Sequence, residues 1–202
     1  MKRISFLLVL ILLGFAGCLK NPIHTRDSQE PAGSSGTWET PAMPEVVLSN
    51  LMFAYNEKHV QNYQLCFGQD FLFSSPEDSI EAEAQGFGYL YYLWNKDVEI
   101  TVTENIFSKF TEDNNSLDLI LSYSSNYPDS IGDTLAVINR DYTLRVIQPD
   151  SLQSDTILIE GTAAFHLSQP SYNLWSIYLW EEIITSRSGD SWANFKAEYR
   201  NR

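Results

Sequence analysis

Residues 157–167 have the sequence ILIEGTAAFHL, which is the clearest alternating pattern in this 202-residue chain. One parity of the pattern holds Ile157, Ile159, Gly161, Ala163, Phe165 and Leu167. The other parity includes Glu160, Thr162 and His166. Because successive side chains of a strand point to opposite faces, this two-residue period predicts a long strand with its apolar face on the core.

Strand patterns continue on both sides of this segment. Residues 117–123 and 135–147 alternate apolar and polar side chains. Residues 174–184 are apolar on both parities up to Glu181, as expected for a strand near the middle of a sheet. Short connections between consecutive strands predict an antiparallel meander.

Helical spacing dominates the first half of the chain. A helix is expected to begin at Pro44, because apolar residues recur every three or four positions from Val47 to Tyr55. A second short helix is expected over 59–65, and a strand over 70–74.

The segment 97–107 fits two patterns. Val98, Ile100 and Val102 alternate as in a strand, whereas Val98, Val102 and Ile106 recur as in a helix. We favour a helix that begins near Asn95. Helices followed by a meander predict an α+β domain, with N-terminal helices packed on one face of a strongly bent antiparallel sheet.

Composition and charge exclude several classes of protein. With 44% hydrophobic and 13% aromatic residues, the chain can bury a sizeable core, which excludes wholesale disorder. The formal net charge of -13 argues against a nucleic-acid binder, whose affinity depends on lysine and arginine. Two cysteines do not make a disulfide scaffold or a zinc site, and we expect no metal and no cofactor.

The N-terminus has the three zones of a secretory signal. Lys2 and Arg3 precede an apolar run over 4–16, which is too short to span a membrane. The string Phe15-Ala16-Gly17-Cys18 resembles the lipobox of bacterial lipoproteins. This resemblance implies that 1–17 are removed and that Cys18 carries acyl chains such as palmitate; an ordinary signal that leaves Cys18 as a free thiol is the alternative.

Residues 18–43 then form a flexible tether rich in proline, glycine and serine, and 44–202 form the folded domain. The residue after Cys18 is Leu19, and not the aspartate that resembles an inner-membrane retention signal. In a cell with two membranes, the anchored protein is therefore expected in the outer membrane. We therefore expect a membrane-anchored protein of the cell envelope.

The order of elements and the C-terminal sequence carry a family resemblance. Trp175–Glu182 is WSIYLWEE and Ser191–Arg200 is SWANFKAEYR, with Ala193 where glycine is usual. These segments resemble the ends of bacterial lipoproteins that have an NTF2-like (cystatin-like α+β) domain. The resemblance implies a cone enclosed by helices and a bent sheet, and pairing of two copies through the sheet. Because this superfold hosts isomerases, dehydratases, transport factors and binding modules, it does not decide the function.

Enzymes of the NTF2-like class place an acid–base residue inside the cone, and two side chains are candidates for that catalytic role. Asp70 precedes an apolar strand and His166 lies on the 157–167 strand. We favour structural roles for both, because Asp70 suits a strand entry or cap and His166 shares the polar face. Cys66 is expected to be a buried apolar side chain. The chain has no glycine-rich phosphate loop and no CxxC, HExxH or GxSxG motif.

Aromatic side chains either line a pocket for an apolar ligand or fill the cone, and we favour filling. The pocket candidates are Tyr55, Trp94, Tyr123, Trp175, Tyr178 and Trp180. At the C-terminus, the spacing of Trp192, Phe195 and Tyr199 predicts a short helical segment that covers the sheet near Trp180. Asn194, Lys196 and Arg200 are expected to lie in water.

Two hypotheses for the function follow. The favoured one is a lipid-anchored envelope protein whose domain binds a small apolar ligand or a protein partner without catalysis. The alternative is an envelope isomerase or hydratase with an acid–base residue in the cone. An open cone that holds a carboxyl or imidazole of shifted pKa favours the enzyme, and a cone filled by rings argues against it.

Overall fold

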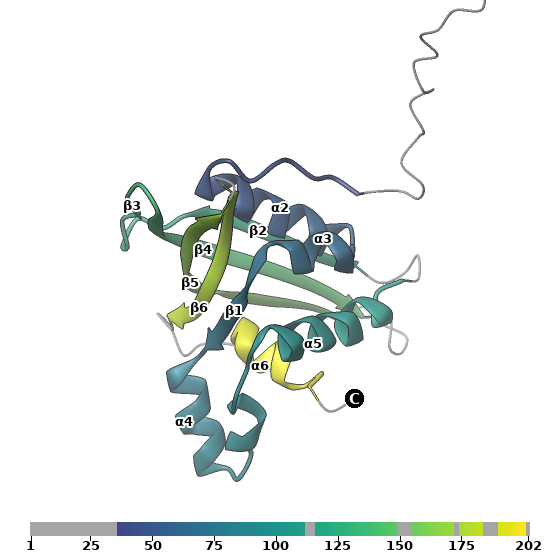
Figure 1. Cartoon of the computed structure of the whole chain (residues 1–202). Coiled ribbons are helices and arrows are strands. Elements are labelled where there is room, and N and C mark those ends of the chain that lie inside the picture. The colour runs from purple at the N-terminus through teal and green to yellow at the C-terminus, as the bar shows by residue number, and fades with distance from the viewer. Residues whose placement is uncertain (1–35, 112–115, 149–154, 172–173, 184–189, 201–202) are drawn as a thin grey trace, which may run out of the picture. The chain divides into compact units, whose positions relative to one another are not determined.

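The computed structural model describes residues 36–111, 116–148, 155–171, 174–183 and 190–200 (Figure 1). The predicted signal segment, Cys18 and the first part of the predicted tether lie outside these residues. The helices are α2 (Pro44–Asn56), α3 (Val60–Leu65), α4 (Pro76–Ala84), η1 (Gly88–Tyr91), α5 (Lys96–Lys109) and α6 (Trp192–Ala197). The strands are β1 (Phe67–Ser74), β2 (Ser116–Tyr123), β3 (Ser130–Ile131), β4 (Leu135–Gln148), β5 (Asp155–Ser171) and β6 (Leu174–Ile183).

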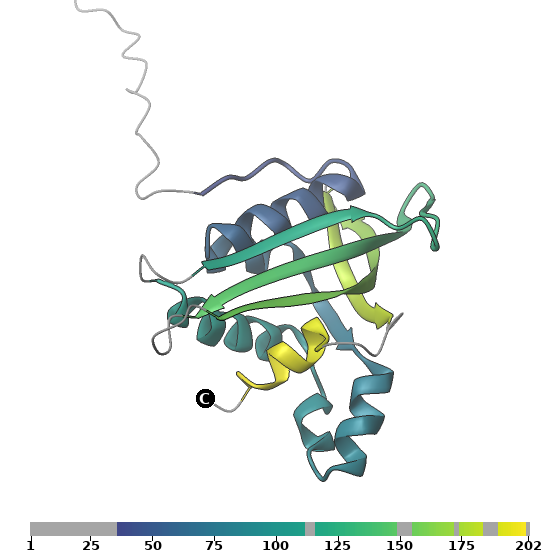
Figure 2. The ribbon, with the colours of Figure 1, turned by 180° about the vertical axis from the view of Figure 1, so that it is seen from behind.

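The sheet has the order β1-β6-β5-β4-β2, with β3 paired to β4. β2, β4, β5 and β6 form the expected antiparallel meander, in which β4 and β5 pair from Leu135↔Ser168 to Gln148↔Asp155 (Figure 2). β1, however, runs parallel to β6. The prediction of a wholly antiparallel sheet was therefore wrong at this edge. β1 comes from the helical half of the chain, so no short hairpin fixes its direction.

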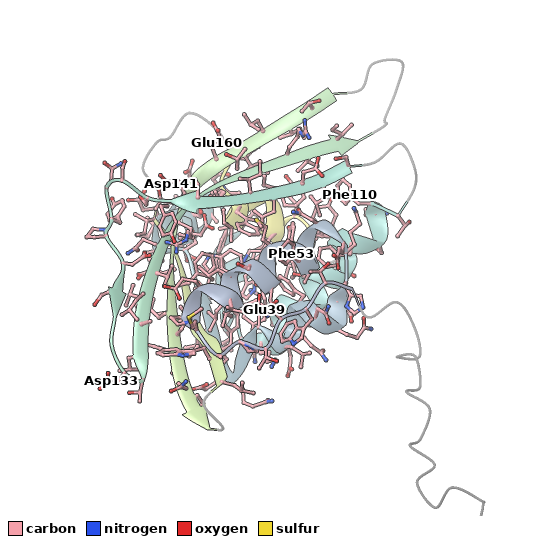
Figure 3. All side chains as sticks on the ribbon, turned by 90° about the horizontal axis from the view of Figure 1, so that it is seen from above. Glu39, Phe53, Phe110, Asp133, Asp141 and Glu160 are labelled. Carbon is pink, nitrogen blue, oxygen red and sulfur yellow. The ribbon has the colours of Figure 1, made fainter. Side chains whose placement is uncertain are left out.

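The curved sheet wraps around a layer of helices (Figure 3). In that view, Asp141 and Glu160 lie on the sheet and Phe53 on the helical layer. The predicted helix at Pro44 is α2, which buries its apolar stripe, and residues 97–107 are helical as favoured. Asn95 caps the start of α5, because its side chain accepts a hydrogen bond of 3.1 Å from the Val98 amide. This cap satisfies a free amide of the first turn and explains where the helix starts.

Residues 36–43 lie against the domain. Asn50 of α2 accepts a hydrogen bond from the Glu39 amide and donates one to the Glu39 carbonyl, at 2.9 and 2.6 Å. The Trp38 ring packs on the core, and the Trp175 amide donates to the Pro41 carbonyl at 2.9 Å. The chain thus enters the domain beside α2 and α3.

α4 and η1 project from the opposite side of the domain (Figures 1 and 2). This projection, residues 76–93, carries several apolar side chains that are more than half exposed: Ile80, Phe87, Tyr89, Tyr92 and Leu93. Leu93 is 87% exposed and has a positive φ of 50°, a conformation that a leucine adopts only at a cost. Among the described residues, no helix has the length and apolar character needed to cross a bilayer.

Candidate functional site

The interior of the cone is filled by aromatic rings, as favoured from the sequence. Tyr55, Trp94 and Trp180 are buried there, with at most 2% of each exposed. The Trp192 ring of α6 lies between them, with its centroid 5.2 Å from that of Tyr55 and 4.4 Å from that of Trp180. Its indole Nε1 donates to the Tyr55 hydroxyl at 3.1 Å. α6 therefore closes the cone with a ring that also satisfies its polar atom.

The other aromatic candidates lie elsewhere. Trp175 is buried at the start of β6, while Tyr123 is 75% exposed beneath the Arg140 guanidinium. Tyr178 lies beside His166 on the outer face of the sheet, with ring centroids 6.0 Å apart. The six predicted pocket residues therefore do not form one pocket; three of them meet in the cone.

Neither catalytic candidate faces the cone. Asp70 is exposed on β1. His166 is on the outer face of β5, with its Nε2 3.7 Å from the Glu181 carboxylate. Cys66 is buried, and burial raises the pKa of its thiol. The described residues contain no group of three or more His, Cys, Asp or Glu side chains arranged to hold a metal.

A buried ion pair occupies the cone instead. Lys196, which was predicted to lie in water, is fully buried, and that prediction was wrong. Its Nζ lies 3.3 Å from both carboxylate oxygens of Glu99, which is also fully buried on α5. Burial lowers the pKa of Lys196, while Glu99 and Glu182 act to raise it. The C-terminal helix thus places a cation at the centre of the domain.

Helical spacing explains why both residues are buried. Lys196 is four residues after Trp192 and three before Tyr199, so it belongs to the apolar stripe that Trp192 and Tyr199 define. Glu99 is likewise three residues before Val102 and seven before Ile106 on the buried face of α5. The pair could have been identified from the sequence, because Glu99 and Lys196 are opposite charges that each lie on the apolar stripe of a helix.

Aromatic faces enclose the Lys196 ammonium. Its Nζ lies 3.4 Å from the ring centroid of Phe73 and 3.7 Å from that of Trp180. The centroids of Trp94 and Trp192 are farther away, at 5.6 and 5.8 Å. These distances are within the range in which a ring face attracts a cation.

Glu182 is the second buried carboxyl of the cone. Its Oε2 accepts a hydrogen bond of 2.7 Å from the Tyr142 hydroxyl, which itself accepts one of 3.1 Å from the Trp192 amide. The Tyr142 ring packs directly over Gly161, where a Cβ would lie 2.5 Å from its hydroxyl oxygen. The Oε1 atom of Glu182 is buried and makes no hydrogen bond of standard geometry among the described residues, although the Trp180 indole acts as a weak donor to this carboxyl. Burial raises the pKa of Glu182 from 4.5 to about 7, although Lys196 and the Tyr142 hydroxyl oppose the shift.

This shift predicts that stability falls as the pH rises from 4.5 towards 7. The folded protein retains a proton on Glu182 that the unfolded chain releases, so the contribution of Glu182 to the free energy of unfolding decreases with pH in this window, by at most about 1.4 kcal/mol per pH unit. Glu182→Gln removes the contribution. In urea unfolding between pH 4.5 and 7, the free energy of unfolding of Glu182→Gln is expected to rise relative to that of the wild type as the pH increases. Glu104→Gln, at an exposed position of α5, is the control, and a wild-type curve parallel to that of Glu182→Gln would contradict the assignment.

A groove lies on the surface between α6 and the α4–η1 projection. It has a volume of about 360 Å³ and is lined by Asp78, Glu81, Ala82, Gln85, Phe87, Leu90, Tyr91, Asp190, Asn194, Ala197 and Glu198. Four of these side chains are carboxylates and none is a lysine or arginine. Asp78 also connects α4 to α6, because it accepts hydrogen bonds from Ser191 at 2.7 Å and from Asn194 at 3.1 Å. The groove therefore suits a cationic ligand that also has an apolar part.

Comparison with known proteins identifies the fold. No family model matches the sequence, and no curated protein matches it either. The Kfla4162 protein of Kribbella flavida is 9% identical, with a TM-score of 0.55 over 78% of this chain and 95% of that one. A candidate scytalone dehydratase of Novosphingobium aromaticivorans is 12% identical, with a TM-score of 0.53 over 70% of this chain and 81% of that one. An NTF2-like superfamily protein of Salmonella enterica is 11% identical, with a TM-score of 0.48 over 71% of this chain and 89% of that one. With its helices enclosed by a strongly curved six-stranded sheet, the chain has the NTF2-like α+β fold.

Proposed function

We propose that this protein is a lipid-anchored component of the cell envelope whose NTF2-like domain binds a partner without catalysis. The filled cone is the observation that supports the proposal. Trp192 and Lys196 of α6 occupy the space in which an enzyme of this fold would hold its substrate. Three surface pockets of about 360, 160 and 210 Å³ are lined by described residues, and none of the three includes Glu99, Glu182 or Lys196.

The binding surface that we propose is the acidic groove together with the apolar projection. A pocket of about 360 Å³ is within the size range of ligand sites, and exposed Phe87 and Tyr89 extend it with apolar surface. The lining carboxylates favour a partner segment that carries lysine or arginine beside apolar side chains.

Charge reversal in the groove tests this proposal. The probe is a synthetic peptide of alternating lysine and leucine, and its binding is measured by fluorescence anisotropy at two salt concentrations. Glu81→Lys/Glu198→Lys is expected to weaken binding at least tenfold, and added salt is expected to weaken wild-type binding. The matched control is Glu104→Lys/Glu160→Lys, which changes the net charge equally at exposed positions outside the groove. Equal loss in both variants, or no binding by the wild type, would contradict the groove assignment.

The anchor is tested at Cys18. One acyl chain holds a protein to a membrane only reversibly, since each buried methylene contributes about 0.8 kcal/mol, whereas several chains make attachment lasting. Cys18→Ala is expected to abolish metabolic labelling with palmitate and to leave uncleaved precursor or soluble protein. Cys66→Ala, at the other cysteine, is expected to label normally. Unchanged labelling of Cys18→Ala would end the proposal of a lipid anchor.

A hydratase or isomerase is the second candidate function. Glu182 favours it, because a buried carboxyl with a pKa of about 7 beside a tyrosine hydroxyl is a suitable acid–base group. The fold of the candidate scytalone dehydratase agrees with this alternative. A dehydratase or isomerase activity that is lost in Glu182→Gln, while that variant keeps its fold, would favour the enzyme over the binding module.

A further inference from the structure

The cage around the Lys196 ammonium is built almost entirely by residues outside α6. Phe73 comes from β1, Trp94 from the turn before α5, Glu99 from α5 and Trp180 from β6. Trp192, on α6 itself, contributes the most distant ring face. Phe73, Trp94, Glu99 and Trp180 form this cage. Lys196 is therefore the occupant of a site that the rest of the domain forms.

The Glu99 carboxylate of the cage is oriented by hydrogen bonds that do not involve Lys196. The Tyr63 hydroxyl donates to Glu99 Oε1 at 2.6 Å, and the Trp94 indole donates to Oε2 at 2.7 Å. Each oxygen keeps a further acceptor position, which the Lys196 ammonium uses. Both donors lie outside α6, so the direction in which Glu99 points does not depend on its cation.

Two more observations indicate a site for a cation rather than a simple ion pair. An ion pair needs one carboxylate, yet here Phe73 and Trp180 also present ring faces within 3.7 Å of the nitrogen. The nearby Glu182 has a buried carboxylate oxygen that makes no hydrogen bond of standard geometry among the described residues. Aromatic faces combined with carboxylates are the groups that recognise organic ammonium ligands.

We propose that the cage is a binding site for a primary alkylammonium group, and that Lys196 occupies it as a built-in competitor. The ligand is an alkylamine or the lysine side chain of a partner. Its ammonium group binds in the cage when the Lys196 side chain is absent from it. This site is separate from the acidic groove, and the inference does not depend on the proposed function.

Chemical rescue tests the proposal. Lys196→Ala removes three methylene groups and the ammonium, which together have the shape of n-propylammonium. Thermal unfolding of this variant is expected to shift to higher temperature as n-propylammonium is added, because a ligand that binds only the folded state stabilises it. 1-Propanol has nearly the same shape without the charge and is expected to give at most a tenth of the shift. Wild-type protein is expected to need at least a tenfold higher propylammonium concentration, because Lys196 competes.

Further variants make the result decisive. Lys196→Ala/Glu99→Gln keeps the space but loses the carboxylate, and Lys196→Met fills the space; neither is expected to respond. If Lys196→Ala is unfolded in buffer, Lys196→Ala/Glu182→Gln removes one of the two buried carboxyls and keeps the cage for the same titration. Equal shifts with propanol and propylammonium, an equal response of the wild type, or no response in either rescue variant would each overturn the proposal.

Discussion

Lys196→Ala is expected to lower the free energy of unfolding by about 3–5 kcal/mol, the range for removing one partner of a buried ion pair. The variant leaves the Glu99 carboxylate fully buried without its cation and opens a void between the Phe73 and Trp180 rings. Chemical unfolding at neutral pH, followed by tryptophan fluorescence, measures the loss.

A double-mutant cycle separates the charge from the packing. Lys196→Met/Glu99→Gln removes both charges and keeps most of the volume, so it is expected to regain most of the stability lost in Lys196→Ala. The single variant Lys196→Met, which leaves the carboxylate alone, is expected to lie between the two. Near-wild-type stability of Lys196→Ala would show that the pair contributes nothing and that the cage tolerates an unpaired carboxylate.

Truncation after Gly189 is expected to unfold the domain. It deletes α6, and with it Trp192, Phe195 and Tyr199, whose side chains are at most 5% exposed. Loss of a buried aromatic side chain typically costs about 3–5 kcal/mol, and three of them exceed the total stability of most domains of this size. Near-ultraviolet circular dichroism of the truncated protein is expected to lose the signal of packed rings.

Two point variants support the interpretation of the truncation. Trp192→Ala is expected to lose about 3–5 kcal/mol alone. Asp190→Asn, at an exposed position just before α6, is expected to unfold like the wild type. If the truncated chain instead melts normally but no longer binds the lysine–leucine peptide, α6 is a functional lid rather than part of the core.

Local patterns predicted most of the fold because local spacing decides it. The alternation over 157–167 matches β5, and buried Ile159, Ala163 and Phe165 confirm its apolar face, although Ile157 at its start is 41% exposed. The stripe after Pro44 matches α2 for the same reason. The direction of β1 could not be predicted, because it depends on pairing with β6 about a hundred residues later in the chain.

The candidate site was harder to predict than the fold. Asp70 and His166 are the two candidates that side-chain chemistry suggests, although the sequence favours structural roles for both; the burial pattern of their strands directs both side chains away from the cone. The stripe of Trp192, Phe195 and Tyr199 predicted that Lys196 lies in water, whereas Lys196 is fully buried. Its burial depends on Glu99, 97 residues earlier, and no pattern within one segment reports such a pairing.

The pairing of β1 with β6 and the late position of α6 also set the order in which the chain can fold during synthesis. When β1 leaves the ribosome, its partner strand has not been translated, and Lys196 is translated 97 residues after Glu99. Non-local pairing of this kind delays folding until nearly the whole polypeptide is available. Products that stop short of α6 would expose their rings and be removed by proteases.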